Sequence, residues 1–357
     1  MSLSGSNTGA LLPYTALNLL EEACGRAGIS PEKITGEVVF KFLDQLNLTL
    51  TQLLNRGIQL WKRQQLILPC YLMVNQIQLP AGTNLVTTLN RRSLSRIAGT
   101  AFSDSGGVAA NATDDNFATI CTQTAPNGAI GIQCATATVC TQIGILSGGA
   151  GSFGVFFEYS NDNITWTTVS SATVTFDQAG EWEWFDMQGT PVSGALYWRV
   201  RSSGTVPFSV EELFFGNNPN EIYLGSWNLD DYSNMPNKFA TGQVVNYYQQ
   251  RNISASVLYV WPTPDMTARY DTLVVWTTEY LDQVTQLTQG LPVPQRWFDA
   301  LTAMLARRLC RSLPKEADFS RYETLVNEEK EAVWLAESEE RDIAPVNYDL
   351  GVRYYTA

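Results

Sequence analysis

Histidine is absent from the 357 residues of this chain. Because histidine is the commonest general base, metal ligand and pH switch near neutrality, its absence excludes Ser-His-Asp and Cys-His catalytic pairs and the zinc sites that use it. The six cysteines form no Cys-x-x-Cys pair, so we expect free, buried thiols rather than a zinc knuckle or a redox motif. No cofactor is implied.

Long apolar runs are also missing. The longest candidate, residues 66–74, is too short for a membrane span and is interrupted by Pro69. The first thirteen residues lack a basic stretch followed by an apolar one, so we expect no signal peptide and a protein made in a cytoplasm. The net charge of −12 argues against a protein that grips nucleic-acid phosphates. It leaves open a protein that stands beside DNA without binding it specifically.

Helical patterns are found in the first and last thirds of the chain. Thr15 is suited to cap a helix that runs to about residue 27, with Gly28 as its left-handed C-terminal residue. Apolar residues at steps of three and four predict a longer helix over residues 39–61. Two further helices are predicted over residues 295–312 and 315–341, the first bounded by Pro294 and Pro314.

The middle of the chain has another composition. Residues 98–218 contain 15 of the 26 glycines and no lysine. Short apolar segments separated by Asn, Asp, Gly and Ser predict an antiparallel sandwich, with strands at residues 154–159, 165–169, 195–201 and 208–215. Outside it, strands are predicted at residues 71–79, 223–227, 257–261 and 273–280.

These patterns predict an α+β protein. A helical domain with a small β region, residues 1–97 and 219–342, is interrupted by the all-β sandwich of residues 98–218. Residues 343–357 form an extended tail.

Several short motifs, in their order along the chain, resemble the head-to-tail adaptors of short-tailed bacteriophages, the tail accessory factors beneath the portal. They are residues 19–23 with Gly28, 55–61, 78–83, 231–232, 242–247, 261–264 and 291–294, followed by Trp297, Ala300, Leu301, Leu305 and Ala306. The resemblance implies a virion structural protein, assembled in the host cytoplasm, without enzymatic activity. Its implied partners are the portal protein, a downstream tail (nozzle) protein and further copies of itself in a dodecameric ring. Double-stranded DNA would pass through that ring without specific binding.

Residues 112–119, 158–166 and 197–201 resemble, in this order, the discoidin-like or galactose-binding-like jelly roll that is often found in carbohydrate-binding modules. The first segment departs from the Asp-Gly-Asp spacing of that family. Asp114, Asp115 and Asn116 still offer oxygen ligands for calcium, although we favour a solvated turn and assign no metal site.

Tryptophans are the candidate contacts of the sandwich. Trp166 and Trp198 fall at strand positions that normally fill a sandwich core, and we expect them there. Trp182 and Trp184 alternate with Glu181 and Glu183, which predicts one strand face that could contact a glycan or a virion neighbour.

Two further groups are candidates for an interface with the portal or a neighbouring subunit. Arg307, Arg308 and Arg311 lie near the end of a predicted helix, where positive charge also offsets the helix dipole. Tyr348, Tyr354 and Tyr355 lie in the tail, and tyrosine is enriched at interfaces.

Two alternatives to the adaptor remain open. One is a glycan-binding module on a helical stalk. The other is a cell-wall hydrolase that uses a pair of carboxylates, since a glycosidase needs no histidine. The glutamates of residues 315–341 are more typical of a solvated helix face than of such a catalytic pair. In a ring-shaped assembly, the same charges could line a channel and repel DNA phosphates.

Overall fold

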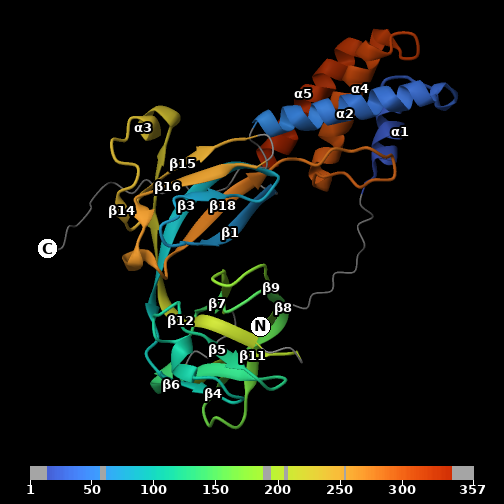
Figure 1. The fold of residues 1–357 in the computed structure, drawn as a ribbon. Helices are drawn as coiled ribbons and strands as arrows, with labels where there is room; N and C mark the ends of the chain where they lie inside the picture. Colours follow the sequence, from blue (N-terminus) through green and yellow to red (C-terminus); the bar gives the residue numbers. More distant parts are fainter. Residues whose placement is uncertain (1–13, 57–61, 188–193, 205–207, 253–254, 340–357) are drawn as a thin grey trace, which may run out of the picture. The chain divides into compact units, whose positions relative to one another are not determined.

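The computed structural model describes residues 14–56, 62–187, 194–204, 208–252 and 255–339 (Figure 1). They divide into two compact units. Residues 64–277 form the β unit, and the described residues before and after them form the helical unit. Among the helices of the described segments, none is long and apolar enough to cross a membrane.

The helical unit contains α1 (Ala16–Arg26), η1 (Pro31–Lys33), α2 (Gly36–Arg56), η5 (Gln295–Trp297), α4 (Phe298–Ser312), η6 (Phe319–Arg321) and α5 (Tyr322–Glu339). The predicted cap of α1 is confirmed, because the Thr15 hydroxyl accepts the backbone N–H of Asn18 and the Asn18 side chain accepts that of Thr15. Gly28 has the expected left-handed conformation, with φ +73°.

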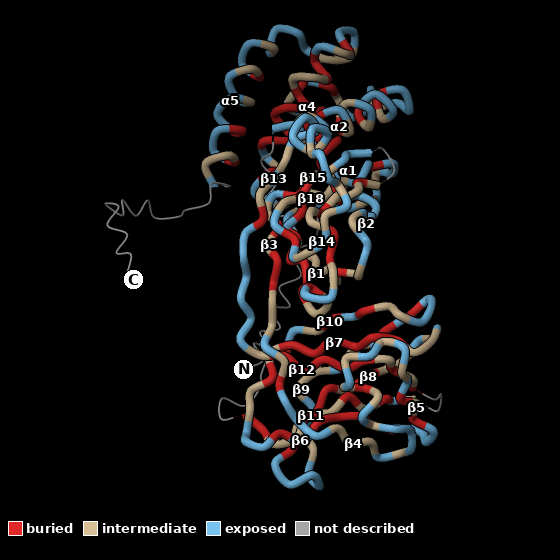
Figure 2. Tube along the Cα trace, turned by 60° about the vertical axis from the view of Figure 1, so that its left-hand side comes forward, coloured by how far each residue is buried: buried red, intermediate tan, exposed pale blue. Residues whose placement is uncertain are grey.

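One apolar core joins the four α-helices of this unit. Phe42, Leu46, Leu50 and Leu53 of α2 are buried in it, as the periodicity predicts, together with Trp297 and most of α4. In Figure 2, α5 has buried residues on one side and exposed ones on the other. The predicted C-terminal end of the second helix, including Ile58 and Trp61, lies outside the described residues.

The β unit consists mainly of antiparallel strands. They are β1 (Arg63–Pro69), β2 (Gln76–Gln78), β3 (Thr83–Arg96), β4 (Thr100–Ser103), β5 (Cys121–Gln123), β6 (Ala129–Thr138), β7 (Gln142–Ser147), β8 (Gly151–Ser160), β9 (Thr167–Phe176), β10 (Trp182–Asp186), β11 (Ala195–Ser202), β12 (Phe208–Tyr223), β13 (Gly225–Trp227), β14 (Thr241–Gly242), β15 (Asn246–Gln250), β16 (Val257–Trp261), β17 (Thr263–Pro264) and β18 (Thr272–Glu279). Its short helices are η3 (Ala109–Ala112), α3 (Leu229–Ser233) and η4 (Met266–Ala268).

A single sheet runs through the whole β unit in the order β1-β18-β3-β12-β7-β10. The long strand β12 pairs with β3 at its C-terminal end, where Glu221 faces Arg92, and with β7 nearer its N-terminal end, where Phe215 faces Ile143. The boundaries at 98 and 218 that the sequence predicts for the inserted domain therefore fall just after β3 and inside β12 (Figure 1). Residues 98–218 are joined to the rest of the unit by two paired strands.

Residues 98–218 form the predicted antiparallel sandwich. The sheet β4-β6-β11-β8-β9 covers one side of a core that β7 and β12 close from the other. Trp198 lies fully buried in this core, as predicted. A second core, around Leu89, Tyr247, Leu258 and Val275, lies between β3, β18 and the sheet β13-β15-β16-β2.

Trp166 is not in the sandwich core, and this prediction is wrong. The residue precedes β9, is half-buried, and lies on the outer face of the five-stranded sheet with its ring 3.7 Å from the guanidinium carbon of Arg199. Arg199 is held there by Glu158, with an Nη2–Oε2 distance of 2.7 Å. The guanidinium supplies a planar partner for the indole, beside the rings of Phe102 and Tyr197.

Other strand predictions need correction outside the insertion. The strand predicted at residues 71–79 is a turn followed by the short β2, while β1 and the long β3 carried no recognised signal. The β region outside residues 98–218 is therefore larger than expected. The prediction of residues 257–261 coincides with β16, and the α+β class is confirmed.

Candidate functional site

A pocket of about 490 Å³ opens in the β unit, between the loop after β1 and the outer side of β7 and β10. Its wall consists of Cys70, Tyr71, Leu72, Val74, Phe117, Leu146, Gln178, Gly180, Glu181, Trp182, Glu211 and Arg269. We call it the Trp182 pocket. Aromatic and aliphatic side chains alternate there with an amide, two carboxylates and a guanidinium, a mixture typical of small-molecule sites.

Stacked aromatic rings support the floor of the pocket. The rings of Trp182 and Trp184 lie 5.0 Å apart and nearly parallel, and Phe117 meets Trp182 edge-on at 5.8 Å. Phe214 of β12 packs behind them in the same apolar cluster. Trp182 and Trp184 project to the same side because alternate residues of a strand do so.

Buried hydrogen bonds fix the loop between β9 and β10, which forms one rim. Ser147 is fully buried, its hydroxyl donates to the carbonyl of Gln178 at 2.7 Å, and it accepts the backbone N–H of Glu181 at 3.1 Å. Glu181 Oε2 accepts the backbone N–H of Asp177 at 2.7 Å. The Gln178, Glu181 and Glu211 side chains are therefore presented by a preorganised rim and by β12.

Tyr71 ties the opposite rim to the floor. Its hydroxyl accepts the backbone N–H of Trp182 at 3.2 Å, and burial raises the pKa of the phenol. The loop after β1 thus closes over the sandwich through a bond between residues far apart in the sequence.

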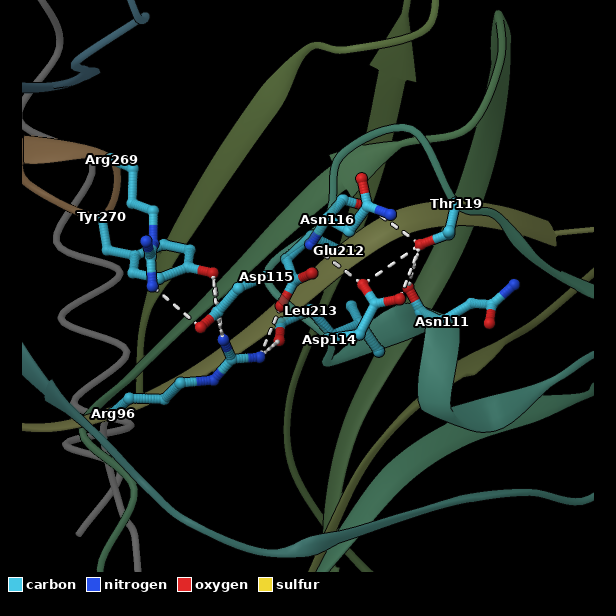
Figure 3. A network of polar contacts seen from close by, with 10 residues as sticks. All are labelled: Arg96, Asn111, Asp114, Asp115, Asn116, Thr119, Glu212, Leu213, Arg269 and Tyr270. Carbon is cyan, nitrogen blue, oxygen red and sulfur yellow. Dashed lines mark hydrogen bonds and ion pairs between the residues drawn. The ribbon is translucent and has the colours of Figure 1, made fainter. Parts of the chain in front are cut away.

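A polar network anchors Arg269 at the pocket wall. Asp115 lies between Arg96, Arg269 and the hydroxyl of Tyr270 (Figure 3), with an Arg269 Nη2–Asp115 Oδ2 distance of 2.8 Å. Arg96 also pairs with Glu212, which is fully buried. Burial raises the pKa of Glu212 to about 7, although Arg96 opposes the shift. Two arginines and two carboxylates balance one another here.

The same network occupies the candidate calcium ligands. Asp115 is engaged by two guanidinium groups. Asp114 accepts the hydroxyl of Thr119 at 2.9 Å and the backbone N–H of Asn116 at 2.9 Å. Within the segments that the structure describes, no group of three cysteine or acidic side chains could hold a metal ion. These three residues therefore stabilise a loop and the junction with residues 269–270.

The structure describes the three arginines that the sequence suggests for an interface, but not the three tyrosines. Arg307 pairs with Glu329 of α5 through two contacts, and Arg308 donates to Gln45 and Gln52 of α2. Both side chains hold helices of their own unit together and are partly exposed, and their role at an interface stays a prediction. Arg311 is exposed. Tyr348, Tyr354 and Tyr355 lie outside the described residues.

Trp182, from the strand face that the sequence singles out, lines the pocket, but this face is not the open contact surface that the sequence predicts. Trp182 and Trp184 are only 7% and 8% exposed, so neither offers an open ring for stacking, and Trp182 contributes floor. Reasoning from the sequence missed Tyr71, Phe117, Gln178, Glu211 and Arg269 as partners. They come from five separate segments, and no periodicity or spacing signals their approach.

Comparisons with known proteins concern the sandwich. No protein family and no curated protein matches this chain. Among solved structures, the CBM32 of AlyQ in complex with 4,5-unsaturated mannuronic acid is 21% identical over 35% of this chain and 98% of its own, with a TM-score of 0.29. The CpGH89CBM32-5 structure from Clostridium perfringens, in complex with GalNAc-β-1,3-galactose, is 15% identical over 33% of this chain and 94% of its own, also at 0.29. A chitosan-binding module 1 from a Paenibacillus sp. IK-5 chitosanase/glucanase is 22% identical over 34% and 99%, at 0.29.

Proposed function

We propose that the β unit binds a glycan in the Trp182 pocket. The observation that carries the proposal is the convergence of Tyr71, Phe117 and Trp182 with Gln178, Glu181 and Glu211 around one volume of about 490 Å³. Aromatic and aliphatic walls cover the C–H faces of a sugar ring, while carboxylate and amide oxygens accept its hydroxyl protons.

The preorganised rim favours binding of a ligand that is itself polar and flexible. Ser147 and Tyr71 hold the two rims before any ligand arrives, so little side-chain ordering is left for the binding step. We assign binding without cleavage, and a glycan should be recovered intact after incubation with the protein. Release of reducing ends would favour the carboxylate-dependent hydrolase instead.

Replacement of Phe117 by alanine should weaken glycan binding at least about tenfold, because the ring forms a wall of the pocket. The measurement is a glycan array on the full chain, followed by calorimetric titration of the glycans it selects. Phe102→Ala is the matched control, since Phe102 is also half-buried but lies on the five-stranded sheet beside Trp166. Gln178→Ala, which removes an exposed side chain, should weaken binding without a change in melting temperature. The proposal fails when no glycan binds, or when F117A and Q178A bind as the parent does.

The second candidate is the virion connector that the adaptor resemblance implies, with a portal, a tail protein and further copies of this chain as partners. Exposed apolar side chains on the helical unit support it: Phe40 and Leu48 on α2 are 74% and 55% exposed, and Trp334 on α5 is 62% exposed. Large apolar side chains on a helical surface are typical of interfaces.

The connector hypothesis predicts that the full chain co-sediments with portal rings from the same virus. Trp334→Ser should abolish this attachment and leave the melting temperature unchanged, because the side chain is mostly exposed. Glu331→Ser, which alters another exposed residue of α5, is the control. Absence of co-sedimentation at micromolar concentration would reject the connector role and leave glycan binding unaffected.

A further inference from the structure

The Trp182 pocket carries an excess of negative charge. Among the described residues of its wall, Arg269 is the one that is cationic, and Asp115 pairs with that guanidinium at 2.8 Å. Arg96 and Glu212 complete the network but are not among the residues that line the pocket (Figure 3). The arginine therefore offers little attraction to an acidic ligand.

Two carboxylates of the wall lack a cationic partner. Among the described residues, neither Glu181 nor Glu211 takes part in an ion pair. Glu181 uses Oε2 for the backbone N–H of Asp177, which leaves Oε1 for a ligand. Glu211 lies on β12 and approaches Gly180. A Cβ atom added to this glycine would lie 3.9 Å from Oε2 of Glu211.

The carboxyl groups of this region are partly buried. Burial raises the pKa of Glu211, and burial together with the neighbouring Glu181 raises that of Glu183. Apolar neighbours such as Phe117, Leu146 and Trp182 exclude water from the same wall. A positive group in the pocket would lower the energy of both carboxylates, whereas a negative group would raise it.

We infer that the pocket selects a sugar with a free ammonium group, a deacetylated hexosamine, over neutral sugars and most strongly over uronic acids. The inference rests on the proposed glycan binding and names the class of glycan. An ammonium group has three donors and no acceptor, which suits the free oxygens of Glu181 and Glu211. The aromatic wall then covers the remaining C–H face of the ring.

The test compares three oligosaccharides of equal length on the full chain: glucosamine, N-acetylglucosamine and galacturonic acid tetramers. Titrations are made by calorimetry at pH 6 and low salt, where the amines are largely protonated. Glucosamine should bind about tenfold more tightly than N-acetylglucosamine, the size expected for one charged hydrogen bond, and galacturonic acid should not bind measurably. Added salt should reduce the preference for glucosamine.

Charge-neutral variants identify the residues responsible. Glu211→Gln and Glu181→Gln should each reduce the preference for glucosamine over N-acetylglucosamine severalfold, because glutamine keeps an oxygen acceptor but carries no charge. Glu183→Gln is the matched control. It removes the same charge two residues after Glu181, but Glu183 does not line the pocket. The preference should survive in it.

The outcomes separate this inference from the proposed function. Binding of N-acetylglucosamine or galacturonic acid as tightly as glucosamine would overturn the ammonium preference and leave glycan binding standing. An undiminished preference in both E181Q and E211Q would also overturn it. Failure of all three tetramers, with no binding partner on the glycan array, would overturn both.

Discussion

Replacement of Trp198 by alanine is expected to lower the free energy of unfolding of the β unit by about 3–5 kcal/mol, the range for removal of a large aromatic ring from a core. The side chain is fully buried, packs with its ring 5.7 Å from that of Tyr159, and donates its indole N–H to the carbonyl of Thr138 at 3.0 Å. The variant would leave a cavity and an unpaired carbonyl. Calorimetric melting of the full chain measures the loss.

Trp166→Ala is the control, because it removes the same side chain from the outer face of the same sheet. Its ring is half-buried and stacks on Arg199, so a loss of about 1 kcal/mol is expected. Equal losses in the two variants would show that Trp166 belongs to the core, as its sequence position suggests. That result would contradict the structure.

Replacement of Arg96 by methionine should destabilise the β unit by about 3 kcal/mol at pH 8, because it leaves Glu212 buried without its cation. The loss should shrink to about 1 kcal/mol at pH 5. The pKa of Glu212 in the folded protein is about 7, above the usual value of 4.5. The carboxyl is therefore protonated in both folded proteins at pH 5. Because Arg96 lowers the pKa of Glu212, its removal raises that pKa further, so the two proteins differ in protonation, and the loss grows, as the pH rises above 7.

The double variant Arg96→Met with Glu212→Gln isolates the cause. Relative to Glu212→Gln alone, which also lacks the carboxyl, the loss caused by Arg96→Met should be the same at both pH values. Asp271, whose pKa burial raises to about 6 in spite of Arg91, titrates in the parent and in both variants and cancels in the comparison. A pH-independent loss in the single variant would show that Arg96 stabilises the junction through Asp115 and Tyr270 alone.

The local features of this chain followed from its sequence. Thr15 and Gly28 bound α1, and the apolar spacing of Phe42, Leu46, Leu50 and Leu53 placed one face of α2 in a core, because both signals act within a few residues of the chain. The sandwich of residues 98–218 was recognisable for the same reason: short apolar segments and turn residues specify antiparallel strands locally. The strand β3 was missed because its polar residues, Asn90, Arg91 and Arg92 among them, hide the alternation.

Only the tertiary structure decided where side chains from distant segments meet. Trp166 and Trp198 have similar strand-like surroundings in the sequence, yet Trp198 lies on β11 with its side chain in the core, whereas Trp166 precedes β9 and stacks on Arg199 at the outer face of the sheet. The Trp182 pocket depends on the long pairing of β3 with β12, which brings the loop after β1 and residues 269–270 to the sandwich. The alternation of Trp182 and Trp184 with Glu181 and Glu183 predicted one strand face that contacts a glycan or a virion neighbour. The packing of that sandwich against β1 and β3 buried the tryptophans and left Glu181 and Glu211 at the pocket without cations.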